Sequence, residues 1–180
     1  MSSSGGSAPS VLILVGSTSD LELALDCQDT LDELGIVGSI RVLSAHRTPE
    51  ATAECARNAE KDGYGVLITL AGLSAHLAGA AAAHTLLPVI AVPLAVGPLN
   101  GVDALLASVQ MPTGTPTATV GLDGVRNAGL LAARILAGAH PELREALARR
   151  AERDRARYEP DAIRCEVEKR RQARRESDAG

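Results

Sequence analysis

His46 and Arg47 stand side by side in the segment Ser44–Pro49, which follows a strand expected over 39–43. An imidazole can give and take a proton near neutral pH, and a guanidinium can clamp a phosphate or carboxylate in a fixed geometry. A lone histidine is more often structural than catalytic, but this one adjoins one of only six Lys and Arg residues in positions 1–140. The pair therefore predicts proton transfer beside a bound anion.

A second segment, Gly16–Asp20, also places small and polar residues after an apolar run. Its backbone amides and the helix that follows favour an anion, with the Ser17 hydroxyl on a phosphate and the Asp20 carboxylate on ribose hydroxyls. Alternatively, Ser19 and Asp20 serve only as caps, with Ser19 as the N-cap and Glu22 completing a capping box. The segment is neither a dinucleotide fingerprint nor a Walker loop, so a dinucleotide fits poorly.

A third segment, Ala71–Gly79, is rich in small residues that let the backbone approach a ligand closely. His76 within it is expected near the same pocket, or else acts as a cap or a packed side chain. His84 and His140 fall at helix ends, where histidine is common, and they receive no chemical role. The sequence shows no Ser-His-Asp order, no H-x-x-x-H pair and no carboxylate pair, which disfavours hydrolase and metalloenzyme functions.

An alternation of apolar runs and helical patterns must position these segments. Strands are expected at 11–15, 39–43, 65–71, 89–92 and 117–120, and helices at 19–35, 49–63, 75–85, 102–109 and 125–136. Short connections between alternating strands and helices predict a parallel sheet in a three-layer α/β/α fold. In such sheets ligands bind beyond the carboxyl ends of the strands. The segments 16–20, 44–49, 71–79 and 94–101 should therefore meet there.

Composition supports one folded α/β domain. The chain has 180 residues, 46% of them hydrophobic and 22% charged, which is within the globular range. We expect a disordered, Gly/Ser-rich segment over 1–10, the α/β domain over 11–140 and a charged helical tail over 141–180, interrupted at Pro160. The tail is either a solvated helix or an arm that packs on a neighbouring subunit.

Several function classes are disfavoured by composition. Aromatic residues make up 1% of the chain and its net charge is −4, which argues against base-stacking surfaces, nucleic-acid binding and anionic-membrane binding. The three widely spaced cysteines indicate reduced thiols rather than disulfides or a zinc site. No signal-peptide pattern and no apolar run long enough to cross a membrane is present, so a cytoplasmic location is expected.

Taken together, five separated motifs closely resemble the class I N5-carboxyaminoimidazole ribonucleotide mutase family of bacterial purine biosynthesis. They are Gly16-Ser17-x-Ser19-Asp20, Ser44–Pro49, Ala71-Gly72-x-x-Ala75-His76-Leu77, Leu87–Ile90, and Gln110–Pro112 with Asn127-Ala128. The resemblance extends from about Val11 into the early tail. It implies a flavodoxin-like subunit that forms an octamer, uses no metal or organic cofactor, and moves a carboxylate from N5 to C4 of an aminoimidazole ribonucleotide.

The resemblance also implies roles for individual residues. His46 would protonate N5 as CO₂ leaves and later collect the C4 proton, while His76 would orient the substrate or His46. The Gly72–Gly79 segment would shape a pocket for CO₂, and Ser17, Asp20 and Arg47 would hold the ribonucleotide. The full expected substrate-binding set is Gly16, Ser17, Ser19, Asp20, Ser44, Ala45, Arg47, Gly72 and Leu77, with His46 and His76 as catalytic residues.

Some positions depart from the pattern of this family. Leu21 replaces a common Trp, Leu73 and Ser74 interrupt a Gly/Ala segment, Ala78 replaces a Pro and Ala104 replaces a Ser. None of these changes removes a proposed chemical group. They concern the rigidity of the pocket and its affinity for substrate.

Three alternatives remain open. The class II enzymes carboxylate aminoimidazole ribonucleotide directly with CO₂, but they typically carry Lys after the histidine and Asn in the third motif, so Arg47 and His76 favour the mutase. A related pyridinium carboxylase has a further N-terminal domain, for which the ten residues before the first expected strand leave no room. A nucleotide-binding regulatory module would need the Gly16–Asp20 segment but not His46.

Overall fold

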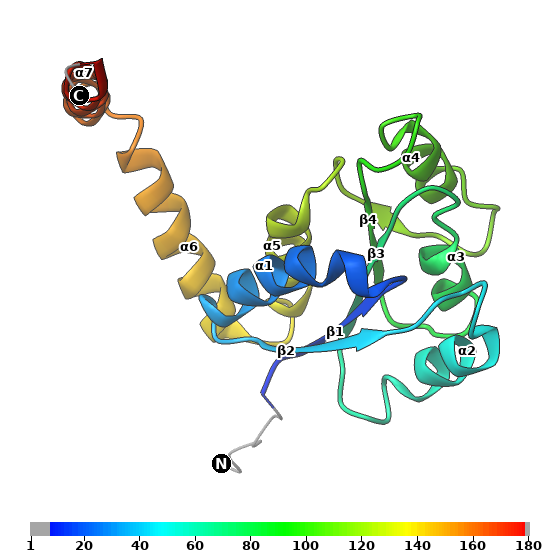
Figure 1. Ribbon diagram of the computed structural model, residues 1–180. Coiled ribbons are helices and arrows are strands. Elements are labelled where there is room, and N and C mark those ends of the chain that lie inside the picture. The colour runs from blue at the N-terminus through cyan, green and yellow to red at the C-terminus, as the bar shows by residue number, and fades with distance from the viewer. Residues whose placement is uncertain (1–7, 179–180) are drawn as a thin grey trace, which may run out of the picture. The chain divides into compact units, whose positions relative to one another are not determined.

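The computed structural model describes residues 8–178 and contains a five-stranded parallel sheet (Figure 1). Its strands are β1 (Ser10–Val15), β2 (Val37–Val42), β3 (Val66–Ala71), β4 (Val89–Pro93) and β5 (Ala118–Thr119). They lie in the order β2-β1-β3-β4-β5, and Ile13 of β1 pairs with Ile40 on one side and with Ile68 on the other. This is the flavodoxin-like order, in which the direction of winding reverses between β1 and β3.

The central strands are apolar because helices cover both of their faces. Val11 to Val15 are each 0% exposed, and the side chains of β4 are also buried. The edge strand β2 is partly exposed along its whole length. Continuous apolar runs therefore identified the buried strands, as expected for a parallel sheet.

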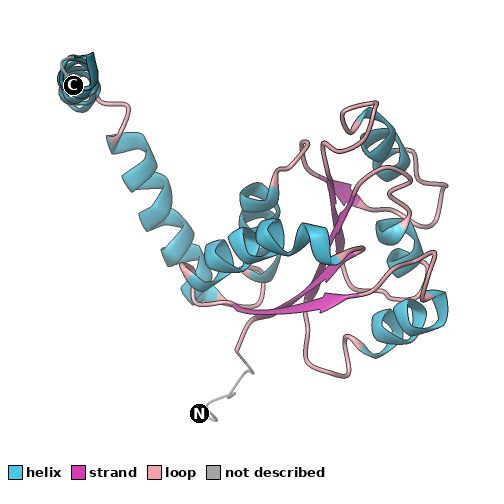
Figure 2. Cartoon of the chain, in the orientation of Figure 1, coloured by secondary structure: helices cyan, strands magenta, loops and turns pink. Residues whose placement is uncertain are grey.

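Helices form the outer two layers (Figures 1 and 2). The helix α1 (Leu21–Asp32) packs against α5 (Val125–Leu136) on one face of the sheet. The other face carries α2 (Pro49–Asn58), α3 (Leu77–Ala82) and α4 (Val102–Val109). The three-layer α/β/α architecture predicted from the sequence is thus confirmed.

The entry into α1 differs from the expected capping box. A 3₁₀ turn, η1 (Thr18–Asp20), precedes α1, and the side chain of Ser17 caps it by accepting a hydrogen bond from the backbone N of Ser19 at 3.3 Å. The expected N-cap role of Ser19 is therefore wrong. The tight turn brings the Ser19 amide back to the Ser17 hydroxyl before the regular helix begins.

The helix α3 is shorter than the 75–85 span expected from its small residues. Two tight backbone bonds precede it, from Ala75 N to Leu73 O at 2.9 Å and from His76 N to Ser74 O at 2.7 Å. These bonds hold residues 73–76 in a turn, so regular helix begins only at Leu77. By contrast, α4 and α5 have the bounds that the sequence predicted.

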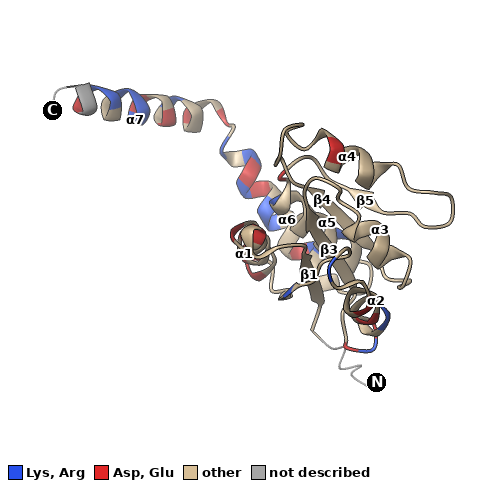
Figure 3. Ribbon diagram, turned by 45° about the vertical axis from the view of Figure 1, so that its right-hand side comes forward, with Lys and Arg blue, Asp and Glu red and all other residues tan. Residues whose placement is uncertain are grey.

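The chain divides into two compact units, one ending at Leu143 and the other beginning at Arg144. Of the expected disordered segment 1–10, residues 1–7 lie outside the described residues and Ser10 begins β1. The helices α6 (Pro141–Ala156) and α7 (Pro160–Asp178) confirm a charged helical tail interrupted before Pro160 (Figure 3). Within α7 the Arg170 side chain donates to Glu166 at 2.6 Å, which lowers the pKa of that carboxyl. No helix in residues 8–178 is long and apolar enough to cross a membrane.

Candidate active site

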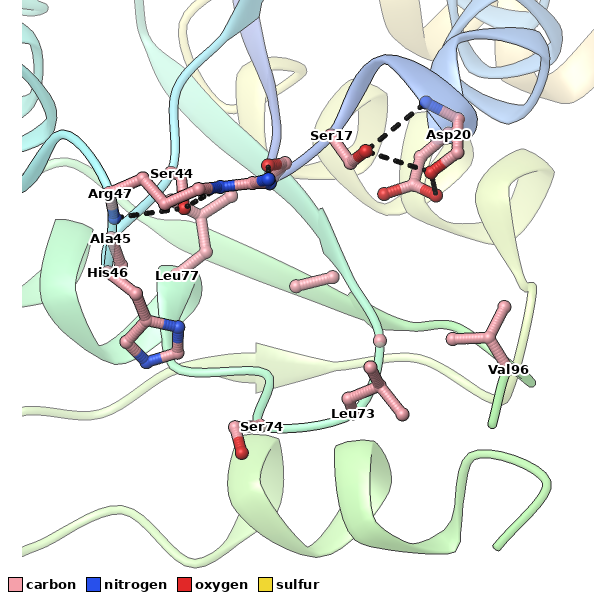
Figure 4. Close-up of a pocket in the computed structure, with 14 residues that line it drawn as sticks. Ser17, Asp20, Ser44, Ala45, His46, Arg47, Leu73, Ser74, Leu77 and Val96 are labelled. Carbon is pink, nitrogen blue, oxygen red and sulfur yellow. Dashed lines mark hydrogen bonds between the residues drawn. The ribbon is translucent and has the colours of Figure 1, made fainter. Parts of the chain in front are cut away.

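A pocket of about 680 Å³ lies at the carboxyl ends of the central strands (Figure 4). Loops that follow β1, β2 and β3 line it, and Val96 adds a side chain from the loop after β4. This is the place where strand order reverses, and the volume is typical of sites for small ligands. Segments far apart in the sequence therefore meet here, as the strand pattern predicted.

The pocket contains nearly all of the residues singled out from the sequence. Those that line it are Gly16, Ser17, Ser19, Asp20, Ser44, Ala45, His46, Arg47, Gly72 and Leu77. His76 does not line the pocket and instead contacts His46. The pocket is also lined by Leu73 and Ser74, which belong to the Gly72–Gly79 segment expected to shape a CO₂ pocket, and by Ala71 and Val96, which were not individually assigned. Val96 is an ordinary aliphatic residue, and only its place in the 94–101 segment pointed to this edge of the sheet.

The loop after β1 is organised by its own side chains. Ser19 Oγ lies 3.0 Å from Ser17 Oγ and donates to Asp20 Oδ1 at 2.9 Å. Ser17 adopts extended backbone, and the 3₁₀ turn starts immediately after it. Capping and ligand binding are therefore compatible here, because the same turn that Ser17 caps presents hydroxyls and a carboxylate to the pocket.

Arg47 joins the loops that follow β1 and β2 (Figure 4). Its Nη2 donates to the Gly16 carbonyl oxygen at 2.9 Å, and its Nε donates to Ser44 Oγ at 3.4 Å. A guanidinium has five N–H groups in a planar fork, so these two bonds leave three for a ligand. The arrangement fixes the cation at the pocket wall beside the Ser17–Asp20 turn.

Thr48 closes the loop that carries His46 and Arg47. Its Oγ1 accepts from the Ser44 amide at 3.0 Å and donates to the Ser44 carbonyl at 3.1 Å. Thr48 occupies the N-cap position of α2, but its side chain makes no capping bond there. The hydroxyl is used on Ser44 instead, whose own Oγ accepts from the backbone N of Arg47 at 3.2 Å.

Thr48→Val should loosen this loop, because it removes the hydroxyl but keeps the shape of the side chain. We expect a loss of about 0.5–1.5 kcal/mol in the free energy of unfolding, the usual contribution of one hydrogen bond, together with weaker ligand binding through Arg47. Thr48→Ser keeps the hydroxyl and should retain both properties. Urea unfolding would measure the stability and calorimetry the ligand affinity. A Thr48→Val variant with the stability and affinity of the parent protein would show that the Thr48 hydroxyl does not hold this loop.

His46 and His76 form a pair across two loops. His46 Nε2 lies 2.9 Å from His76 Nδ1, and the ring planes meet at 79° with centroids 5.0 Å apart. Such a bond needs one ring to donate and the other to accept, so the pair can hold one shared proton but not two between these atoms. Because His46 lines the pocket and His76 does not, the geometry favours proton exchange by His46 and orientation by His76.

The three cysteine thiols lie outside the pocket. Burial raises the pKa of the Cys27 thiol to about 12, which keeps it protonated at neutral pH. Cys55 is also buried and Cys165 is exposed, and all three thiols are unbridged. Within residues 8–178 no group of three or more His, Cys, Asp or Glu side chains could hold a metal ion.

Comparisons with known proteins agree with this site. Residues 10–157 match the family model described as AIR carboxylase. The N5-carboxyaminoimidazole ribonucleotide mutase of Mycobacterium tuberculosis (strain CDC 1551 / Oshkosh) is 50% identical over 139 residues, which cover 77% of this chain and 80% of that protein. The protein of the same name from Pyrococcus horikoshii is 46% identical over 158 residues, covering 88% and 89% of the two chains.

A solved structure shares the fold over most of its length. Treponema denticola PurE superposes with a TM-score of 0.79 at 32% identity, covering 87% of this chain and 98% of the other. The family match includes all of the segments that line the pocket. The chain therefore belongs to the AIR carboxylase family.

Proposed function

We propose that this protein is an N5-carboxyaminoimidazole ribonucleotide mutase of purine biosynthesis. The observation that carries the proposal is the pocket, which combines His46, Arg47 and Asp20 in a chain about half identical to relatives of that name. A ribonucleotide needs an anion site and a partner for ribose hydroxyls, and the reaction needs one group that can carry a proton. The three side chains match those needs.

The reaction can be written with a single proton carrier. His46 donates a proton to N5 as the bond between N5 and the carboxylate carbon breaks, which releases CO₂ inside the pocket. The electron-rich C4 then attacks CO₂ and forms a C–C bond. Neutral His46 then removes the proton from C4. This step restores the imidazole ring of the ribonucleotide and returns His46 to the protonated form in which it began. His76 holds the His46 ring in place through the 2.9 Å contact between Nε2 and Nδ1.

Substrate binding is assigned to the loops after β1 and β2. We place the phosphate on the Ser17 hydroxyl, the amides of its turn and the guanidinium of Arg47, and the ribose hydroxyls on Asp20. The backbone and small side chains of the remaining pocket residues would shape the space for the base. They include Gly16, Ser19, Ser44, Ala45, Gly72 and Leu77.

An assay with two substrates separates the mutase from direct carboxylation. Purified protein without ATP should convert N5-carboxyaminoimidazole ribonucleotide to 4-carboxy-5-aminoimidazole ribonucleotide, and should do so without added bicarbonate. Efficient carboxylation of aminoimidazole ribonucleotide by CO₂, with no turnover of the N5-carboxylated substrate, would assign the protein to class II. The names of the relatives favour the mutase.

The proposal extends to assembly and location. We propose a homo-octamer in the cytoplasm, with the catalytic domain over 11–140 and the charged helices over 141–180 as a tail. Val102, Leu106 and Val109 share one face of α4 and are 52%, 48% and 51% exposed. An apolar helix face of this kind commonly marks a contact between subunits.

Light scattering should therefore give a mass well above that of one 18.5 kDa chain at micromolar concentration. Leu106→Asp should shift the protein to smaller species, because it places a charge on the α4 face. Leu25→Asp is the matched control, since Leu25 is 46% exposed but lies on α1, across the sheet. A parent protein that runs as a stable monomer would refute the assembly.

A further inference from the structure

The loop after β4, residues 94–101, reaches the pocket through one side chain. Within this segment, all of which the structure describes, Val96 alone lines the pocket, and it is 42% exposed. It lies across the pocket from Arg47 (Figure 4). The Val96 amide donates to the carbonyl oxygen of Leu94 at 2.9 Å, which closes a tight turn over residues 94–96. The position of the Val96 side chain therefore depends on what holds this turn.

The sheet holds the beginning of the loop. Leu94 is 0% exposed, and its amide donates to the carbonyl oxygen of Ala71 at 3.0 Å. Gly101, with φ of 83°, brings the end of the loop back, since a Cβ added there would lie 2.8 Å from Ala95 Cα. The base of the loop is thus closely packed, and the next backbone donor that needs a partner is the amide of Ala95.

Asp123, from the connection between β5 and α5, provides that partner. Its Oδ1 accepts from the Ala95 amide at 2.9 Å, although the two residues are 28 positions apart. Asp123 has φ of 52°, a left-handed conformation that aspartate tolerates better than most residues. Its own amide donates to the Pro93 carbonyl oxygen at 3.0 Å, so its backbone is fixed to the end of β4. A carboxylate that accepts from a backbone amide makes a stronger hydrogen bond than a neutral acceptor does.

We propose that Asp123 is a positioning residue for substrate binding, because its carboxylate holds the turn at Ala95 where Val96 contacts the bound ribonucleotide. This inference rests on the proposed mutase function. Asp123 does not line the pocket, so its effect on the substrate passes through the loop after β4. Without the bond, the turn samples other arrangements and only a fraction of the molecules presents Val96 to the ligand. The apparent affinity falls in proportion to that fraction.

Asp123→Gly removes the carboxylate without disturbing the backbone, because glycine adopts a positive φ freely and keeps the amide that donates to Pro93. We expect this variant to raise KM for N5-carboxyaminoimidazole ribonucleotide about three- to tenfold, which corresponds to one typical hydrogen bond, and to leave kcat within about twofold. The proton carrier His46 is untouched, so the loss belongs to binding. Destabilisation alone would instead lower the measured kcat and leave KM unchanged, because fewer molecules would be folded.

Two further single variants separate the acceptor from the backbone. Asp123→Asn keeps an oxygen that can accept from the Ala95 amide and also tolerates positive φ, so its KM should stay close to that of the parent protein. Asn100→Gly is the matched control, because Asn100 is another left-handed residue, with φ of 47°, and does not line the pocket. Its KM should equal that of the parent protein.

A double substitution tests the route through Val96. Val96→Ala should raise KM by itself, and adding Asp123→Gly should raise it by less than about twofold more, because the contact that Asp123 maintains is already lost. Amide hydrogen exchange over residues 94–101, followed by mass spectrometry, should be faster in Asp123→Gly than in the parent protein. This measurement needs no substrate.

An unchanged KM in Asp123→Gly overturns the inference. So does a KM in Asp123→Asn as high as in Asp123→Gly, or a double variant in which the two single effects multiply in full. A parent protein that does not turn over the N5-carboxylated substrate overturns the proposed function instead. In that case unchanged hydrogen exchange in Asp123→Gly would still show that Asp123 does not hold the loop.

Discussion

Replacing His46 with asparagine should lower turnover by at least ~10²–10⁴-fold, the range for losing a general acid–base group, while substrate still binds. Asparagine is close in size to histidine and keeps hydrogen-bonding capacity, but it cannot carry a proton at neutral pH. Both halves of the proposed reaction use His46, once to protonate N5 and once to remove the C4 proton. Steady-state rates and calorimetric binding, measured on the same preparation, separate the loss of chemistry from a loss of affinity.

His76→Asn is the matched control for this experiment. His76 contacts His46 through its Nδ1 and does not line the pocket, so its loss should misalign the carrier without removing it. We expect a smaller fall in turnover than for His46→Asn. If the His46 variant keeps near-normal turnover while the His76 variant loses it, the proton carrier is His76. If both keep it, the proton moves through water or the substrate itself.

Replacing Arg47 with alanine should weaken binding of the ribonucleotide by roughly 2–5 kcal/mol, the range for losing one partner of a charged pair that the complex desolvates. The substitution removes the guanidinium that donates to the Gly16 carbonyl and to Ser44, so it also unties the two loops that border the anion site. Asp20→Ala should weaken binding over the same range if the carboxylate holds ribose hydroxyls. Calorimetry with the carboxylated product measures both affinities.

Two further variants make the binding experiment selective. Arg57→Ala removes an exposed arginine of α2 that lies outside the pocket, where its Nη1 is 3.5 Å from His84 Nδ1. This variant should leave the affinity for the ribonucleotide unchanged. Asp20→Asn keeps the side chain that accepts from Ser19 but removes its charge. Unchanged affinity in Arg47→Ala and Asp20→Ala, with intact circular dichroism, would mean that these residues serve only to shape their loops.

The order of secondary structure and the location of the site could be predicted from the sequence because both depend on local patterns. An apolar run such as Val11–Val15 is typical of a strand buried on both faces. The sequence pattern likewise predicted the observed bounds of α4 and α5. Because the carboxyl ends of parallel strands share one edge, polar segments after successive strands had to converge. The family resemblance then supplied the reaction, which local patterns do not specify.

Only the tertiary structure decided which side chains work together within that site. The bond between His46 and His76 joins residues thirty positions apart, and it depends on the paths of two loops that leave β2 and β3, strands that β1 separates in the sheet. Serine and threonine hydroxyls can bond several kinds of neighbouring group, and the folded turns decide which partners Ser17, Ser19 and Thr48 have. Leu73 has a left-handed backbone conformation, with φ of 54°, against the local preference of leucine. Its side chain packs on Gly97, and sequence periodicity does not record such a long-range contact.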